Sequence, residues 1–130
     1  MSDKSGFRFE KLDVWQKSME WVDKIYHVTA NFPADEKFGL ISQLKRSSLS
    51  VASNIAEGSG RSSAKDFARF IEIAYGSLME AICQCTIAKR QGFLSADDFQ
   101  YIYIKTEEIA KMLSGLRAYL HKTKKRETTR

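Results

Sequence analysis

The sequence is poor in the residues that end or bend secondary structure. It contains one proline, Pro33, and seven glycines among 130 residues. All-β domains reverse direction every few residues and rely on glycine and proline at those turns. Their scarcity therefore argues against an all-β fold and favours a mostly helical chain.

Cysteine and long apolar runs are scarce as well. Cys83 and Cys85 are the only cysteines. Two residues apart on a helix, they point about 200° away from each other, which excludes a shared disulfide or metal site. Free thiols are typical of a reducing compartment. No run approaches 18 apolar residues and residues 1–10 lack a signal-peptide core, so we predict a cytoplasmic protein without membrane contact.

Positive charge is concentrated at the C-terminus. The formal net charge is +5, and five of the 21 Lys and Arg residues lie in the last nine positions. Such a tail is either a solvated, disordered end or a contact for nucleic-acid phosphates. We predict one domain over residues 1–121, followed by a basic, disordered tail over residues 122–130.

Apolar residues recur by threes and fours in four segments. The spacing predicts helices over about residues 11–31, 36–57, 63–91 and 96–121. Because the connections between them are short, sequential helices must lie antiparallel. We therefore predict an all-α fold, an up-down-up-down antiparallel four-helix bundle that oligomerises.

Two of these helices carry apolar seams that differ in regularity. The first helix is predicted to bury the heptad-spaced residues Leu12, Trp15, Met19, Val22, Tyr26 and Thr29. The third helix has the most regular seam, made of Phe67, Ile71, Ala74, Leu78, Ala81, Cys85 and Ala88.

Residues that are typical of helix caps lie at the predicted helix ends. Asp35 is predicted to cap the second helix, and Gly58 to end it in the left-handed conformation. The third and fourth helices should start with capping boxes, formed by Ser63 with Asp66 and Ser95 with Asp98.

A second surface on the middle helices points away from the predicted core. On the third helix it contains Ile73, Gly76, Cys83 and Ile87, with Arg69, Glu72 and Glu80; on the second it contains Arg46, Ser50, Ser53, Asn54 and Glu57. A mid-helix glycine destabilises a helix by about 1 kcal/mol relative to alanine, which favours close approach of another backbone at Gly76. The alternative is an ordinary solvated surface. If this surface joins subunits, we expect charge pairs to set the register between them, from Arg46 or Arg61 to Glu57, Glu72 or Glu80.

The usual catalytic patterns are missing. Di-iron bundles need Glu-x-x-His on paired helices, and neither His27 nor His121 has that partner. The segment 58–61 (Gly-Ser-Gly-Arg) lacks the preceding strand and the Gly-Lys ending of a phosphate-binding loop. Its simpler role is to end one helix before the next begins, and anion binding is the alternative. We predict no catalytic residue, no metal site and no cofactor.

Nucleic-acid contact is the more promising chemistry. Arg61, Lys65 and Arg69 follow one helical line, which is either a solvated face or a phosphate-binding surface once repeated around an oligomer. The tail supplies four further candidate contacts, Lys122, Lys124, Lys125 and Arg126.

Several motifs recur in one order along the chain. They are Phe9-x-x-Leu12-x-Val14-Trp15, Tyr26-x-x-Thr29-x-x-Phe32-Pro33, Glu36-x-Phe38-Gly39-Leu40, Gln43-x-x-Arg46, Ser53-Asn54-Ile55-Ala56-Glu57-Gly58, Arg61 and Ile73-Ala74-x-Gly76-Ser77-x-x-Glu80. Over residues 7–120 this succession resembles the four-helix-bundle proteins encoded by intervening sequences in bacterial 23S ribosomal RNA genes. Ala52 departs from the proline of many relatives, which predicts a straighter second helix. Cys83 and Cys85 also depart from the acidic or leucine residues typical there.

The resemblance implies more than a fold. Similar proteins form ring-shaped homopentamers, and the accessory protein of diversity-generating retroelements, which shares the fold, binds a reverse transcriptase and nucleic acid. The resemblance implies that Arg46, Asn54, Glu57, Arg61 and Glu80 shape subunit contacts or a shared polar site. It implies no established enzymatic activity.

We therefore predict a non-enzymatic, homo-oligomeric bundle, pentameric by resemblance, that binds RNA through charge and shape. One alternative is an adaptor whose ligand is another protein. The other is a metal-dependent nuclease that uses Glu57, Glu72 or Glu80.

Overall fold

The computed structural model describes residues 5–128, with side chains described as far as Thr123. The element order is η1 (Arg8–Lys11), α1 (Asp13–Thr29), η2 (Ala34–Glu36), η3 (Lys37–Ile41), α2 (Ser42–Ser59), α3 (Ala64–Arg90) and α4 (Ala96–Thr128). Residues 5–128 contain helices and turns but no strand, which confirms the all-α prediction. No helix in this range is long and apolar enough to cross a bilayer.

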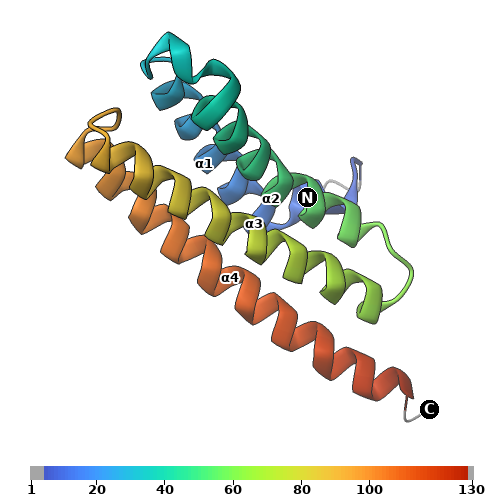
Figure 1. Ribbon diagram of the computed structural model, residues 1–130. Helices are drawn as coiled ribbons and strands as arrows, with labels where there is room; N and C mark the ends of the chain where they lie inside the picture. The colour runs from blue at the N-terminus through green and yellow to red at the C-terminus, as the bar shows by residue number, and fades with distance from the viewer. Residues whose placement is uncertain (1–4, 129–130) are drawn as a thin grey trace.

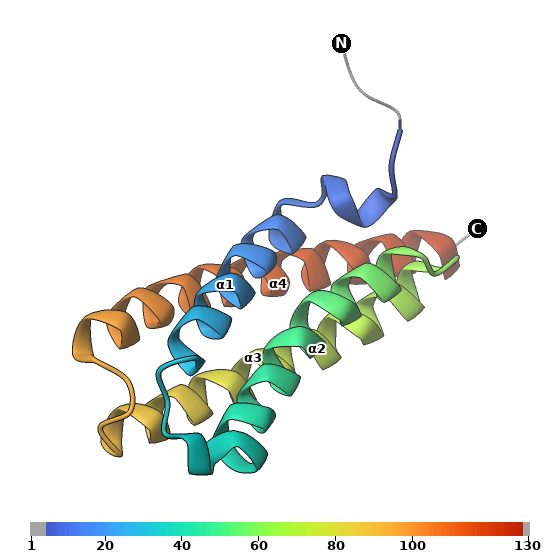
Figure 2. The same ribbon diagram turned by 90° about the horizontal axis from the view of Figure 1, so that it is seen from above.

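The four long helices form a bundle in which each packs against its sequence neighbours and α1 also packs against α4 (Figures 1 and 2). Contacts between helices show their direction. Ser47 meets Gln84 across α2 and α3, whereas Ser50, further along α2, meets Ser77, earlier in α3. These contacts and the course of the four helices in Figures 1 and 2 confirm the up-down-up-down antiparallel four-helix bundle.

The core follows the seam predicted for α3. All seven of its residues are buried: Phe67, Ile71, Ala74, Leu78, Ala81, Cys85 and Ala88. The six from Ile71 onward are fully enclosed, and Phe67 is nearly so. Alanines alternate with larger side chains along this stripe, so neighbouring helices can approach α3 closely. The α3 helix is the centre of the protein's packing.

The seam predicted for the first helix is wrong in part. Met19 and Tyr26 are 37% and 38% exposed, whereas the stripe that faces the core contains Trp21 and Ile25. The buried Ser18 lies on that stripe, where its hydroxyl donates to the Val14 carbonyl at 2.7 Å. Because this serine is polar, it interrupts the apolar pattern of the core-facing stripe, and a search for apolar periodicity does not find that stripe. Val22 and Thr29 of the predicted seam are buried as expected, so the error concerns its exposed members.

The entry to α2 also differs from prediction. Asp35 does not cap α2; it lies in the 3₁₀ turn η2, which makes no side-chain cap. The chain continues through the π-helical turn η3, in which Gly39 has a non-helical backbone (φ −110°, ψ −109°), before α2 begins. Glycine permits this conformation, and an irregular turn therefore replaces the predicted first turn of α2.

The serine half of each predicted capping box is present at the starts of α3 and α4. The Ser63 hydroxyl accepts a hydrogen bond from the Asp66 amide at 3.1 Å, and the Ser95 hydroxyl accepts one from the Asp98 amide at 3.1 Å. Between the two helices, Gly92 follows α3 with a φ of +80°. The two serine contacts satisfy backbone groups that a helix end leaves without intrahelical partners.

The last helix is longer than the predicted range 96–121. The α4 helix continues to Thr128, through most of the segment predicted as a disordered tail. Residues 122–128 contain no proline or glycine, and Lys, Arg and Glu are good helix formers. Residues 129–130 lie outside the described residues, as do the side chains of Lys124, Lys125 and Arg126.

Candidate functional site: a basic end of the bundle

The predicted site residues that precede the basic C-terminal segment fall in three places. Glu57, Arg61, Lys65 and Arg69 surround the connection between α2 and α3. A second group lies along the outer side of the α2–α3 interface and contains Arg46, Asn54, Gly76 and Glu80. Glu72 faces α4 instead and contacts Arg117. The fold therefore does not bring the three candidate nuclease carboxylates of Glu57, Glu72 and Glu80 to one site.

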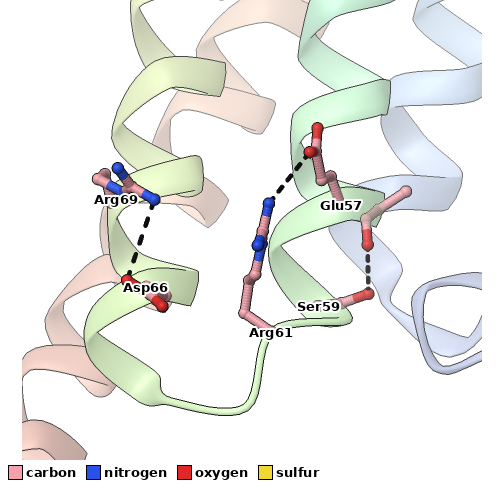
Figure 3. Close-up of polar contacts among 6 residues, drawn as sticks. Glu57, Ser59, Arg61, Asp66 and Arg69 are labelled. Carbon is pink, nitrogen blue, oxygen red and sulfur yellow. Dashed lines mark hydrogen bonds and ion pairs between the residues drawn. The ribbon is translucent and has the colours of Figure 1, made fainter.

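The two arginines at the α2–α3 connection flank one aromatic ring. The guanidinium carbons of Arg61 and Arg69 lie 4.6 Å and 5.4 Å from the centre of the Phe70 ring. Arg61 also pairs with Glu57 at 3.2 Å, and Arg69 with Asp66 at 4.0 Å (Figure 3). These side chains are about half exposed, so the pairs are screened and leave the arginines accessible.

Lysine residues extend this positive surface. Lys65 is exposed on the first turn of α3 and has no ion pair within the described part of the chain. Because α3 and α4 run antiparallel, the start of α3 and the end of α4 lie at the same end of the bundle (Figure 1). Exposed Lys122 therefore joins Arg61, Lys65 and Arg69 at what we call the basic end.

Arg8 also belongs to the basic end, although it was not among the residues predicted there. It comes from η1, yet its guanidinium donates to the Ser59 carbonyl at 3.3 Å and lies 5.3 Å from the centre of the Phe67 ring. A cavity of about 180 Å³ lies between Arg8, Arg61 and Tyr119. The sequence signal was its position between two phenylalanines, Phe7 and Phe9, which indicates an anchored segment.

Small polar side chains line the α2–α3 interface. The Ser47 hydroxyl donates to the Gln84 side-chain oxygen at 2.7 Å, and the Ser50 and Ser77 hydroxyls share a hydrogen bond of 2.8 Å. The Asn54 amide donates within its own helix, to the Ser50 carbonyl at 2.8 Å. These contacts stabilise the protomer, a role that the signature motif alone did not reveal.

Charged groups flank that interface without pairing across it. Glu80 accepts a hydrogen bond from Gln84 at 3.3 Å, and Arg46 is exposed without an ion pair among the described residues. Arg46 and Glu80 are therefore available to a partner, and their role between subunits stays a prediction.

The two conspicuous glycines have different surroundings. Gly58 is not left-handed, which corrects the prediction; it is buried within α2, and a Cβ there would lie 2.7 Å from the Phe70 Cβ. It allows α2 and α3 to approach each other where they meet the connection. Gly76 faces open space, because a Cβ added there would have no neighbour within 4 Å among the described residues. The predicted close approach of another backbone at Gly76 therefore does not occur within the protomer and would need a partner subunit.

Glu72 belongs to a separate cluster between α3 and α4. Its carboxylate accepts from the Arg117 Nε at 2.9 Å and lies 3.7 Å from the His121 Nε2. A cavity of about 440 Å³ opens beside it, with Tyr75 and Ser114 in its lining. Within the chain, Arg61 pairs with Glu57 and not with Glu72, because α3 turns the Glu72 carboxylate towards α4.

An apolar groove lies on another side, between α1 and α2. It has a volume of about 290 Å³ and is lined mainly by apolar side chains, among them Trp15, Met19, Leu49 and Ala56. Leu49 is 46% exposed. This groove contains part of the stripe predicted as the core seam of the first helix.

The cysteines point apart, as predicted. Cys83 is exposed and Cys85 is buried, where desolvation of the thiolate raises the pKa of Cys85 to about 12. Within the part of the chain that the structure describes, no three His, Cys, Asp or Glu side chains are grouped to hold a metal ion.

Comparison with known proteins agrees with this architecture. A crystal structure from Bacteroides thetaiotaomicron, described as a protein with unknown function from the S23 ribosomal protein family, is 25% identical to this chain. The match has a TM-score of 0.74 and covers 80% of this chain and 97% of that one. No curated protein matches the chain significantly.

The family assignment has a broader basis. A family model described as 23S rRNA-intervening sequence protein matches residues 10–115, which contain most of the bundle and all of the motifs from Leu12 to Glu80. The chain therefore belongs to the 23S rRNA-intervening sequence protein family.

Proposed function

We propose that this protein is a non-enzymatic homo-oligomer that binds RNA through the basic end. The observation that carries the proposal is that cationic residues from three distant segments lie at one end of the bundle: Arg8, Arg61, Lys65, Arg69 and Lys122. Phosphate groups are recognised by clustered cations of this kind. The family's name supports RNA as the nucleic acid.

The proposed contact is electrostatic and carries little sequence preference. Lys65 and Lys122 have no ion pair among the described residues, so a phosphate displaces only solvent and counterions from them. Arg61 and Arg69 are positioned by Phe70 rather than buried in ion pairs. No element within residues 5–128 has the form of a known base-reading motif, so charge and shape are the means of recognition.

Assembly would multiply this surface. A ring, pentameric by the family resemblance, repeats the basic end once per subunit, and multivalent contact raises affinity without any new contact. The outward side of α3 supports self-association, because Ile73 and Ile87 are 46% and 45% exposed and neither Arg46 nor Glu80 has a charged partner among the described residues. We place this assembly in the cytoplasm, a proposal supported by the free thiols.

Fluorescence anisotropy with a labelled RNA tests the binding proposal. Affinity should fall steeply as salt rises, and replacing Lys65 and Arg69 with glutamate should weaken binding at least about tenfold at low salt. The matched control replaces Lys89 and Arg90 with glutamate, because it makes the same two charge changes at the other end of α3. Equal weakening by both variants, or no binding at low salt, would refute the basic end as the contact.

Light scattering tests the oligomer separately. Arg46→Ala should shift the protein towards smaller species while its free energy of unfolding as a protomer stays nearly unchanged, because Arg46 makes no ion pair or hydrogen bond among the described residues. A monomeric wild-type protein would contradict the assembly proposal.

The apolar groove between α1 and α2 favours a second candidate, an adaptor that binds another protein. Exposed Met19 and Leu49 form the kind of apolar surface that marks protein interfaces. Leu49→Asp should abolish capture of such a partner and leave RNA affinity unchanged. Loss of RNA binding in this variant would link the groove to assembly instead.

A further inference from the structure

The cavity at the basic end is lined by buried apolar side chains, by the hydroxyl residues Ser62, Ser63 and Thr123, and by a charged rim. Its floor includes Phe67 and Leu120, which are only 2% and 4% exposed, and its rim includes Arg8, Arg61 and Tyr119. These residues come from η1, the α2–α3 connection, α3 and α4. The site therefore exists only in the folded protein.

Both arginines on the rim are held in place. Arg8 is fixed by the Ser59 carbonyl and the Phe67 ring, and Arg61 by Glu57 and the Phe70 ring. A guanidinium that rests on an aromatic face loses little freedom when it binds an anion, and its edge still presents donors. The rim is therefore suited to phosphate groups.

Tyr119 supplies a different kind of surface. It is the most exposed of the five tyrosines, at 65%, and no ring contact or hydroxyl hydrogen bond engages its side chain within the described residues. An exposed aromatic ring beside arginines is the arrangement with which proteins stack the bases of single-stranded nucleic acid.

We propose that this cavity seats one unpaired base of single-stranded RNA, stacked on Tyr119, while Arg8 and Arg61 hold the neighbouring phosphates. The inference rests on the proposed RNA-binding function and narrows its substrate. A base inside a duplex has both faces covered by its neighbours, so stacking on Tyr119 favours an unpaired base. The volume of about 180 Å³ suits one planar base rather than a drug-sized ligand.

Three probes of equal length separate stacking from charge: an oligoadenylate, an abasic oligonucleotide with the same phosphates, and an RNA duplex. The full-length wild-type protein should bind the oligoadenylate about tenfold more tightly than the abasic strand at one salt concentration. It should also prefer the oligoadenylate to the duplex. Tyr119→Ala should remove the preference over the abasic strand, whereas Tyr119→Phe should retain it, because phenylalanine keeps the ring.

Tyr103→Ala is the matched control. Tyr103 is also exposed on α4, but it lies about 24 Å from Tyr119 along the helix at 1.5 Å per residue. A preference that survives in Tyr119→Ala, or that Tyr103→Ala removes equally, would overturn the stacking site. Equal salt-dependent binding of all three probes by the wild type would also overturn it, while the proposed RNA binding would stand. Failure to bind any probe would overturn both.

Discussion

The α2–α3 interface and the packing of α1 show two ways of joining helices within one bundle. The α2 helix meets α3 through small side chains: Gly58 leaves room for Phe70, and the Ser50 and Ser77 hydroxyls are 2.8 Å apart. The α1 helix is anchored by one large ring, Trp21, which is 1% exposed. The α2–α3 interface therefore depends on the close approach of two backbones, whereas the packing of α1 depends mainly on one large buried side chain.

The polar contacts of these two regions also differ, in the length of the side chains that make them and in their exposure to solvent. At the α2–α3 interface they are buried or half-buried hydrogen bonds made by serine hydroxyls, such as Ser47 to Gln84 and Ser50 to Ser77. Between α1 and α4 they include ion pairs near solvent, Lys17 to Glu108 at 3.2 Å and Lys24 to Asp98 at 2.9 Å. Short side chains hold a fixed geometry, whereas exposed ion pairs are screened by water and salt. The polar contacts of the α2–α3 interface are therefore less sensitive to salt than these ion pairs.

The largest expected effect is at the anchor of α1. Trp21→Ala should lower the free energy of unfolding by about 3–5 kcal/mol, because it opens a cavity and removes the indole hydrogen bond to the Thr106 hydroxyl, 3.0 Å long. Urea denaturation measures the loss. Trp15→Ala, at a half-buried site on the same helix, should cost less; equal losses would show that Trp21 is not the anchor.

The close approach of α2 and α3 gives the next largest effect. Gly58→Ala should destabilise the protein by about 1–3 kcal/mol, since the new Cβ would lie 2.7 Å from the Phe70 Cβ and 3.0 Å from the Phe67 Cδ1. The control is Gly76→Ala, which faces open space in the protomer and should stabilise the α3 helix of the protomer by about 0.5–1 kcal/mol. Shifts of the thermal unfolding midpoint in opposite directions would confirm the contrast, and a neutral Gly58→Ala would refute it.

Removal of one interface hydrogen bond should have a smaller effect. Ser47→Ala leaves the side-chain oxygen of buried Gln84 without its donor and should lower stability by about 1–2 kcal/mol. Ser53→Ala, an exposed serine on the same helix, should change stability by less than about 0.5 kcal/mol. Equal results from chemical denaturation would show that the serine–glutamine contact adds nothing.

The smallest effect should come from an ion pair of α1 and should depend on pH. The hydrogen bond from Lys24 holds the pKa of Asp98 below its ordinary value of 3.8. The unfolded state therefore takes up this proton first, so the stabilisation is present above pH 3.8 and is lost as pH falls through the folded-state pKa. Because the pair is partly exposed, Asp98→Asn should cost no more than about 1 kcal/mol at neutral pH.

The control for this pH dependence is Asp97→Asn, which changes an exposed neighbour that has no ion pair among the described residues. Stability measured against pH should lose part of its acid-side slope only in Asp98→Asn. An unchanged slope would mean that the pair contributes nothing to holding α1 on α4.

The same two regions differ in how well they can be predicted. All seven residues predicted for the α3 seam are buried, because Leu78 and its heptad partners are all apolar or small; the buried Gln84 beside them was not predicted. On α1 two overlapping apolar stripes compete, and the one with the more regular spacing includes the exposed Met19 and Tyr26 beside the buried Val22 and Thr29. Periodicity identifies an amphipathic helix but does not say which of two stripes faces the axis.

Local chemistry in the sequence determined the helical class, the caps at Ser63 and Ser95 and the antiparallel order, because each depends on residues only a few positions apart. Tertiary structure alone decided that Gly58 makes room for Phe70, that Glu72 meets Arg117 and that Arg8 joins the basic end. Those contacts depend on the register and rotation of whole helices against one another. Both are set by packing across the entire core, which no short stretch of sequence contains.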